Sequence, residues 1–218
     1  MNVLIAGAGT LGAQVAQVLA ASGNAVTLVD PDEARLDALR GRFDVRLVSG
    51  DGSEAAVLDR AGAAHAELVV AATGRDEDNL VISLLAKRRF AAPRVVARVN
   101  DDENTWLFDQ RWGVDSAVPA AAPIVSLIEE ATGAADTVAL LRLSSAGVGL
   151  IETAITAESK AAGRPLGDIT LPEGTLVATV VRQGEPTAPS PGLLLRPGDE
   201  LLLVSHSAGE QEIHTAFQ

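Results

Sequence analysis

Along the first 120 residues, short apolar runs alternate with segments of helical periodicity. The runs lie at residues 3–6, 25–29, 45–49, 68–72 and 94–98, with a shorter one at 116–119. They contain no regular polar position, so neither face of such a strand is expected to meet water. Strands of this kind, joined by helices, are typical of an α/β fold with a parallel sheet and helices on both faces.

The segments between the runs carry helix signals. We expect the first helix to end at Ser22 and Gly23 and to bury one apolar stripe, made of Leu11, Val15, Val18 and Leu19. Ser53 is expected to cap the third helix and Asp76 the fourth. A further helix is predicted over residues 103–113.

The character of the sequence changes near residue 120. Residues 120–133 predict one amphipathic helix with an apolar stripe of Ile124, Leu127, Ile128 and Ala131. Strand-like runs follow at 137–143, 149–155, 175–182 and 200–205. We therefore predict a nucleotide-binding lobe over 1–119, a crossover helix over 120–134 and a small α+β lobe over 135–218.

A glycine-rich turn follows the first apolar run. Gly7, Gly9 and Gly12 form the pattern G-x-G-x-x-G at the start of the first predicted helix, with Ala8, Thr10 and Leu11 between them. The first glycine allows the sharp turn, the second lets a pyrophosphate approach the backbone, and the third lets helix and strand pack closely. Asp30 ends the second strand, where a carboxylate can accept both ribose hydroxyls and would repel a 2′-phosphate. The sequence therefore predicts a Rossmann-like site for NAD or a plain adenosine nucleotide.

Polar residues follow later strands of the predicted sheet. Asp51 and Gly52 follow the third strand, and Thr73 and Gly74 follow the fourth. Ligands of an open parallel sheet lie at these carboxyl ends, so we expect Asp51 near the adenine amino group and exposed backbone donors at Thr73 and Gly74 near the phosphates. Arg98 closes the fifth strand and could reach the phosphates. An ion pair with Asp101, Asp102 or Glu103 is the alternative for Arg98.

Composition removes several classes of function. The chain has no Cys, which excludes disulfides and thiolate sites, and no Tyr. Its formal net charge of −12 disfavours binding to nucleic acid. No run approaches the ~20 apolar residues that a membrane span needs, and residues 1–6 lack signal-peptide features. We expect a cytoplasmic protein with no direct membrane insertion.

The sequence offers few groups for catalysis or metal binding. A hydride-transfer enzyme needs an acid or base near the nicotinamide, yet His65, His206 and His214 fall outside the predicted pocket. The acidic segment 100–104 is better explained as a solvated helix start than as a cation site. We therefore predict a non-catalytic, metal-free nucleotide sensor, with a small NAD-dependent oxidoreductase as the alternative.

Four linked segments carry a family resemblance. Residues 2–36, 48–63, 71–87 and 95–119 together resemble the N-terminal lobe of RCK domains, the regulators of potassium conductance that serve Trk and Ktr potassium transporters. Residues 160–204 are similar to the C-terminal lobe of the same domains. The resemblance covers essentially the whole chain in family order.

The resemblance implies a ligand and its contacts. Carried over position by position, it implies the segment Gly7–Gly12 at the phosphates, Asp30 at the ribose, Asp51 and Gly52 near the adenine, and the residues Thr73, Gly74 and Arg98 around the rest. The implied ligands are NAD(H), ATP or ADP, with cyclic di-AMP at the C-terminal lobe of some members. Some Ktr-type members have a Glu after the sixth strand that helps to hold a cation, whereas here Pro119 is followed by three Ala.

The resemblance also implies an assembly. A single unit of this length implies homodimers that form a ring, which we expect to be an octamer, beneath a membrane-embedded potassium transporter subunit. The helix at 120–134 would cross to the partner in each dimer, with an intramolecular helix as the alternative. The protein would then be peripheral to the inner face of the cell membrane.

Overall fold

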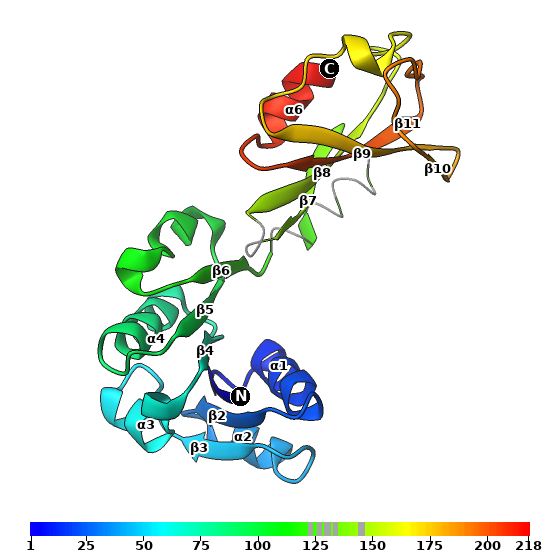
Figure 1. Cartoon of the computed structure of the whole chain (residues 1–218). Coiled ribbons are helices and arrows are strands. Elements are labelled where there is room, and N and C mark those ends of the chain that lie inside the picture. Colours follow the sequence, from blue (N-terminus) through cyan, green and yellow to red (C-terminus); the bar gives the residue numbers. More distant parts are fainter. Residues whose placement is uncertain (122–123, 126–127, 129–131, 133–134, 144–146) are drawn as a thin grey trace. The chain divides into compact units, whose positions relative to one another are not determined.

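The computed structural model describes residues 1–121, 124–125, 128, 132, 135–143 and 147–218 (Figure 1). The chain divides into two compact units, Met1–Ala121 and Ala122–Gln218. No helix among the described residues is long and apolar enough to cross a membrane.

The first unit is built on a six-stranded parallel sheet, as predicted. In sheet order its strands are β3 (Arg46–Ser49), β2 (Ala25–Asp30), β1 (Asn2–Ala6), β4 (Leu68–Ala71), β5 (Arg94–Val99) and β6 (Ser116–Pro119). The order reverses direction between β1 and β4, so the loops after these strands leave a crevice at the carboxyl edge of the sheet.

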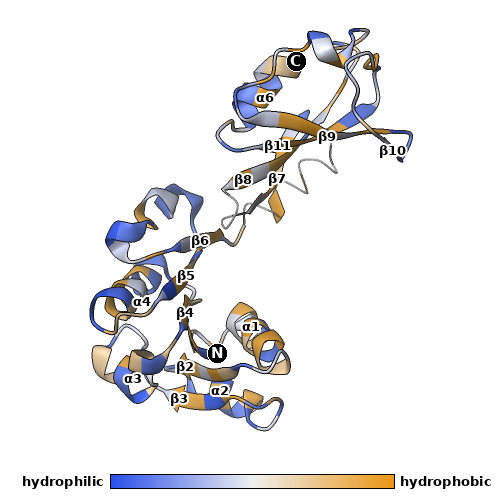
Figure 2. Ribbon diagram, in the orientation of Figure 1, coloured by the Kyte–Doolittle hydropathy of each residue, from blue (hydrophilic) through white to orange (hydrophobic). Residues whose placement is uncertain are grey.

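Helices cover both faces of this sheet. They are α1 (Thr10–Ala21), α2 (Glu33–Leu39), α3 (Ala55–Arg60) and α4 (Asp76–Arg88). Val3 and Ile5 of β1 pack in one core cluster with residues of α1 and α2, whereas Leu4 packs in another with residues of α3 and α4. Figure 2 shows apolar residues along the central strands and also along α1. The Rossmann-like architecture is therefore confirmed.

The stripe predicted for α1 is only partly buried: Val15 and Leu19 pack against the core. Gly12 and Ala16 are the residues that α1 buries, while Leu11 and Val18 are 37% and 64% exposed. The small residues face the sheet because the helix approaches β1 too closely for a larger side chain. Apolar periodicity alone cannot detect a face made of Gly and Ala.

The predicted helix caps are also wrong. Ser53 donates its hydroxyl to Asp51 Oδ1 at 2.7 Å and precedes Glu54, which is the N-cap residue of α3. Asp76 lies inside the first turn of α4, after Arg75, and accepts hydrogen bonds from Asn100 instead. The partner of Asp76 is 24 residues away in the chain, which a local pattern does not encode.

The helix predicted over 103–113 is replaced by two short 3-10 helices, η2 (Asp102–Leu107) and η3 (Gln110–Trp112). Asp101 accepts from the N–H of Glu103, and Asp109 accepts from the N–H of Arg111. Each aspartate therefore caps its own turn, and the second cap interrupts a continuous helix. A third 3-10 helix, η1, spans Ala63–His65.

The second unit is a five-stranded antiparallel sheet with short helices. In sheet order its strands are β10 (Glu185–Thr187), β9 (Thr175–Arg182), β11 (Asp199–Ser205), β8 (Val148–Ala154) and β7 (Thr137–Leu143). The sheet packs with α6 (Glu210–Phe217) and the 3-10 helix η4 (Leu166–Asp168) around a core that includes Ile151, Leu201, Leu203, Ile213 and Phe217. This is the small α+β lobe that the sequence predicts.

An internal ion pair fastens β9 to β11. Arg182 donates through Nε and Nη2 to the two oxygens of Asp199, both at 2.7 Å, and the Asp199 side chain is fully buried. Burial acts to raise the pKa of Asp199, but the hydrogen bonds from Arg182 and from the N–H of Arg196, together with the charges of both arginines, outweigh it and hold this pKa below its usual value.

The predicted crossover helix lies largely outside the described residues, including Leu127 and Ala131 of its stripe. The described members Ile124 and Ile128 are exposed and helical.

Candidate functional site

A cavity of about 1100 Å³ lies at the carboxyl ends of β1, β2, β3, β4 and β5. Most of the predicted site residues line it: Gly7, Ala8, Gly9, Thr10, Asp30, Asp51, Gly52, Thr73, Gly74 and Arg98. Leu11 and Gly12 are the predicted residues that do not line it. The structure therefore brings together residues from five separate loops and strand ends.

The three glycines of the turn have different surroundings. Gly7 has a φ of +110°, and a Cβ added there would lie 2.7 Å from the carbonyl oxygen of Ala72. A Cβ on Gly12 would lie 1.8 Å from the carbonyl oxygen of Gly7. A Cβ on Gly9 would meet no atom within 4 Å, so this glycine leaves open space where a ligand can approach the backbone. Gly7 and Gly12 thus serve packing, and Gly9 faces the cavity.

Asp30 is held rigidly at the end of β2. Its side chain accepts from the N–H of Ala8 at 2.6 Å and from the N–H of Asp32 at 2.9 Å, and the residue is 3% exposed. Arg35 Nη1 lies 3.8 Å from Oδ2. Each carboxylate oxygen has a second lone pair, so both remain able to accept a ribose hydroxyl.

Arg98 carries an unpaired buried donor. Its Nε is buried and has no hydrogen-bond partner among the described residues, and in that part of the chain it forms no ion pair with Asp101, Asp102 or Glu103. A buried donor without an acceptor costs about 1–3 kcal/mol. An anionic group in the cavity would satisfy Arg98, which fits the phosphates of a nucleotide.

One buried amide holds the β4 and β5 walls of the cavity together. Asn79, which is fully buried, accepts from the N–H of Thr73 at 2.9 Å and donates to the carbonyl oxygen of Arg98 at 2.9 Å. The expectation that Thr73 exposes its backbone donor is therefore wrong, because that N–H is used internally. The N–H of Gly74 has no acceptor among the described residues and is available to a ligand.

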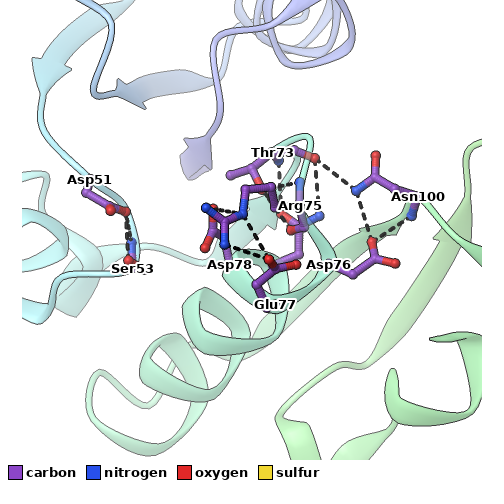
Figure 3. Close-up of polar contacts among 9 residues, drawn as sticks. Asp51, Ser53, Thr73, Arg75, Asp76, Glu77, Asp78 and Asn100 are labelled. Atoms are coloured by element: carbon purple, nitrogen blue, oxygen red, sulfur yellow. Dashed lines mark hydrogen bonds and ion pairs between the residues drawn. The ribbon is translucent and has the colours of Figure 1, made fainter.

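Asp76 extends this network away from the cavity (Figure 3). It accepts from the N–H of Asn100 at 2.7 Å, from the N–H of Asp101 at 3.1 Å and from the side chain of Asn104 at 2.9 Å. Burial acts to raise the pKa of Asp76, but the hydrogen bonds from Asn104 and Asn100 outweigh it and lower the pKa. The carboxylate thus fixes the start of η2 against the start of α4.

Several residues of the cavity were not predicted. Arg35, Arg42 and Phe43 contribute from α2 and the loop after it, and Arg75 and Asp78 contribute from the start of α4. Arg75 could have been predicted from the sequence, because it directly follows Thr73 and Gly74 after the end of β4. The others lie outside any strand end, and the sequence gives no marker for them.

Comparison with known proteins agrees with this geometry. The TrkA-N domain model matches residues 3–120 and the TrkA-C domain model matches residues 150–218. The chain is 38% identical over 213 residues to the Trk system potassium uptake protein TrkA of Mycobacterium tuberculosis (strain ATCC 25618 / H37Rv), covering 98% of this chain and 96% of that protein.

Two solved structures with bound nucleotides share the fold. The GsuK channel bound to NAD is similar over 98% of this chain and 38% of that chain, with a TM-score of 0.59 and 18% identity. The Kef CTD of Shewanella denitrificans in AMP bound form is similar over 62% of this chain and 81% of that chain, with a TM-score of 0.52 and 26% identity. The resemblance drawn from the sequence motifs is confirmed: this chain belongs to the family of Trk potassium uptake proteins built from a TrkA-N and a TrkA-C domain.

Proposed function

We propose that this chain is a nucleotide-sensing regulatory subunit that controls a Trk-type potassium transporter. Its homology to a potassium uptake protein over almost the whole of both chains supports the transport role. The unpaired Nε of Arg98, in the same cavity as the open Gly9, is the observation that carries the nucleotide. NAD in the GsuK structure and AMP in the Kef structure support an adenine nucleotide as the ligand class.

Different residues of the cavity would contact different parts of the proposed ligand. The phosphates would lie at the N-terminus of α1, against Gly9, with the Gly74 N–H and Arg98 as further donors. Asp30 would accept the ribose hydroxyls, and Asp51 with Gly52 would lie beside the adenine. NAD(H), ATP and ADP share the adenosine diphosphate half that these residues recognise.

Regulation follows from differential binding. A ligand that fits two arrangements of an assembly unequally shifts the equilibrium between them, and no chemical turnover is required. We propose homodimers that assemble into an octameric ring, with the segment 120–134 crossing between partners, at the inner face of the membrane beneath a membrane-embedded transporter subunit. Cyclic di-AMP at the second unit is a further proposed ligand, tested by the same titrations.

Calorimetry and uptake measurements test the proposal. The wild-type chain should bind ADP, ATP or NAD at micromolar to millimolar concentration, and Asp30→Ala should abolish this binding. Asp59→Ala is the matched control, because Asp59 is an exposed aspartate that does not line the cavity. Native mass spectrometry should show the octamer, and the wild-type chain, unlike Asp30→Ala, should make potassium uptake by its transporter respond to nucleotide. Absence of nucleotide binding, or steady oxidation of NADH by the pure protein, would contradict the proposal.

A further inference from the structure

Arg75 lines the cavity beside Thr73 and Gly74 and is held there by two acidic neighbours (Figure 3). Its Nε and Nη2 donate to Glu77 Oε1 at 3.0 and 2.6 Å, and its Nε lies 3.6 Å from Asp78 Oδ2. Its backbone N–H donates to the hydroxyl of Thr73 at 3.2 Å. The Nη1 group has no partner among the described residues, so the guanidinium is held on one side by acidic side chains and keeps both N–H donors of Nη1 free.

Asp51 is the complementary group in the same cavity. Its Oδ1 accepts from both the N–H and the hydroxyl of Ser53, at 2.8 and 2.7 Å, while Oδ2 has no partner in the described part of the chain. The adjoining Gly52 is packed so tightly that an added Cβ would lie 3.0 Å from the Cβ of Ala6. Asp51 is therefore a fixed carboxylate with one free acceptor.

The charge around Arg75 decides which part of a nucleotide belongs here. Glu77, Asp78 and, more weakly, Asp51 raise the pKa of Arg75 above its usual value, so three carboxylates act on one guanidinium. That excess of negative charge would repel a phosphate. A neutral group that offers one donor and one acceptor suits it better.

Adenine has that pattern on its edge. Its exocyclic amino group donates, and the adjacent ring nitrogen accepts. Guanine presents a carbonyl oxygen where adenine has the amino group, and that oxygen would face the Asp51 carboxylate. Two acceptors facing each other without a donor are unfavourable.

We propose that Arg75 is a base-specificity residue that donates to a ring nitrogen of adenine while Asp51 accepts from the amino group. This inference rests on the proposed function, whose nucleotides all carry adenine, and assigns the recognition of that base to Arg75. Arg75 thereby contacts the base, whereas Arg98 and the glycine turn bind the phosphates.

The test compares bases and phosphate numbers by calorimetry on the full chain. Wild type should bind ADP at least about tenfold more tightly than GDP. Arg75→Ala should lower the affinities for AMP, ADP and ATP by one common factor, on the order of tenfold, and lower the affinity for GDP much less. Arg88→Ala is the control, because Arg88 is an exposed arginine in the last turn of α4, outside the cavity, and its removal should leave all affinities unchanged.

A second variant reports on the base directly. In Asp51→Asn the side-chain amide can donate to the guanine carbonyl, so the preference for ADP over GDP should shrink or reverse. A purely structural role for Asp51 would instead weaken both nucleotides alike.

Two results would overturn the inference and leave the proposed function standing. One is a loss in Arg75→Ala that grows from AMP to ADP to ATP, because Arg75 would then contact phosphate. The other is an equal loss of ADP and GDP in that variant. Failure of the wild type to bind any adenine nucleotide would end both proposals, and that result is visible before any variant is made.

Discussion

The glycine turn offers a matched pair of substitutions that separates folding from ligand binding. A Cβ on Gly12 would lie 1.8 Å from the carbonyl oxygen of Gly7, whereas ordinary van der Waals contact begins near 3.4 Å. The atoms that this Cβ would meet are the carbonyl oxygen and carbon of Gly7, which belong to the backbone, so rotation of a side chain cannot relieve the clash. The whole of α1 must retreat from β1, and the contact made by Ala16 must open with it. Overpacking of this kind costs about 3 kcal/mol at its upper range.

Gly9→Ala is the other half of the pair. Gly9 has a φ of −64° and a ψ of −177°, a backbone conformation that any residue adopts, and its added Cβ meets nothing within 4 Å. The cost in folding free energy should stay below about 1 kcal/mol, since the cap of α1 contains no side-chain hydrogen bond to lose. The methyl group would occupy the space through which phosphates reach the backbone, so ADP affinity should fall about tenfold or more.

Thermal unfolding and calorimetry measure the two effects on the same samples. Gly12→Ala should lower the melting temperature of the first unit by roughly 10 °C. Gly9→Ala should leave this temperature nearly unchanged but weaken the binding of ADP. Equal stability of Gly12→Ala and wild type would refute the reasoning about packing. Wild-type ADP affinity in Gly9→Ala would refute the reasoning about phosphate access.

Three further predictions concern buried charges. Replacing Arg98 by Met removes the unpaired Nε, so the free energy of unfolding of the ligand-free chain, measured in urea, should rise by about 1 kcal/mol. The affinity for ADP should fall about 100-fold. A fall in both stability and affinity would contradict this account. Because hydrogen bonds lower the pKa of Asp76 in the folded chain, its ionised form contributes stability that is present at neutral pH and lost as pH falls below about 4. The difference in unfolding free energy between wild type and Asp76→Asn should therefore narrow below that pH, and a constant difference would exclude this linkage. Asp199→Ala removes the buried acceptor of Arg182 and of the Arg196 N–H and should destabilise the second unit, as hydrogen exchange can measure, whereas exposed Glu200→Ala should have little effect.

The parallel sheet was accessible from sequence because its central strands β1, β2, β4 and β5 are largely buried, although the edge strands β3 and β6 contain no fully buried residue. A run such as residues 68–72 has no polar position, and that alone distinguishes a central parallel strand from a half-exposed one. The buried face of α1 was only partly accessible, because Val15 and Leu19 pack against the core as predicted but Gly12, which makes the closest approach, carries no apolar signal. Short helices capped by their own aspartates, such as η3, likewise escape a pattern that looks for long periodicity.

The candidate site was predictable where residues sit at strand ends and unpredictable where helices supply the wall. Asp30 is the last residue of β2 and Arg98 the next to last of β5, so the topology brings them to one edge of the sheet. Arg35 and Arg42 reach the cavity from α2 and the loop that follows, and no spacing rule marks them. The hydrogen bond from Asn79 to the carbonyl oxygen of Arg98 joins residues 19 positions apart, on two elements that lie side by side only in the folded chain.

The sharing of Asn79 between Thr73 and Arg98 has a consequence for mutational scanning. A truncation at this position would loosen both strand ends at once, so affinity would fall as though a ligand contact had been lost. The side chain does not line the cavity, however, and a survey scored by affinity alone would misassign it to the recognition surface. Only a paired readout, in which the on-rate and local amide exchange are followed together, would reveal it as scaffolding.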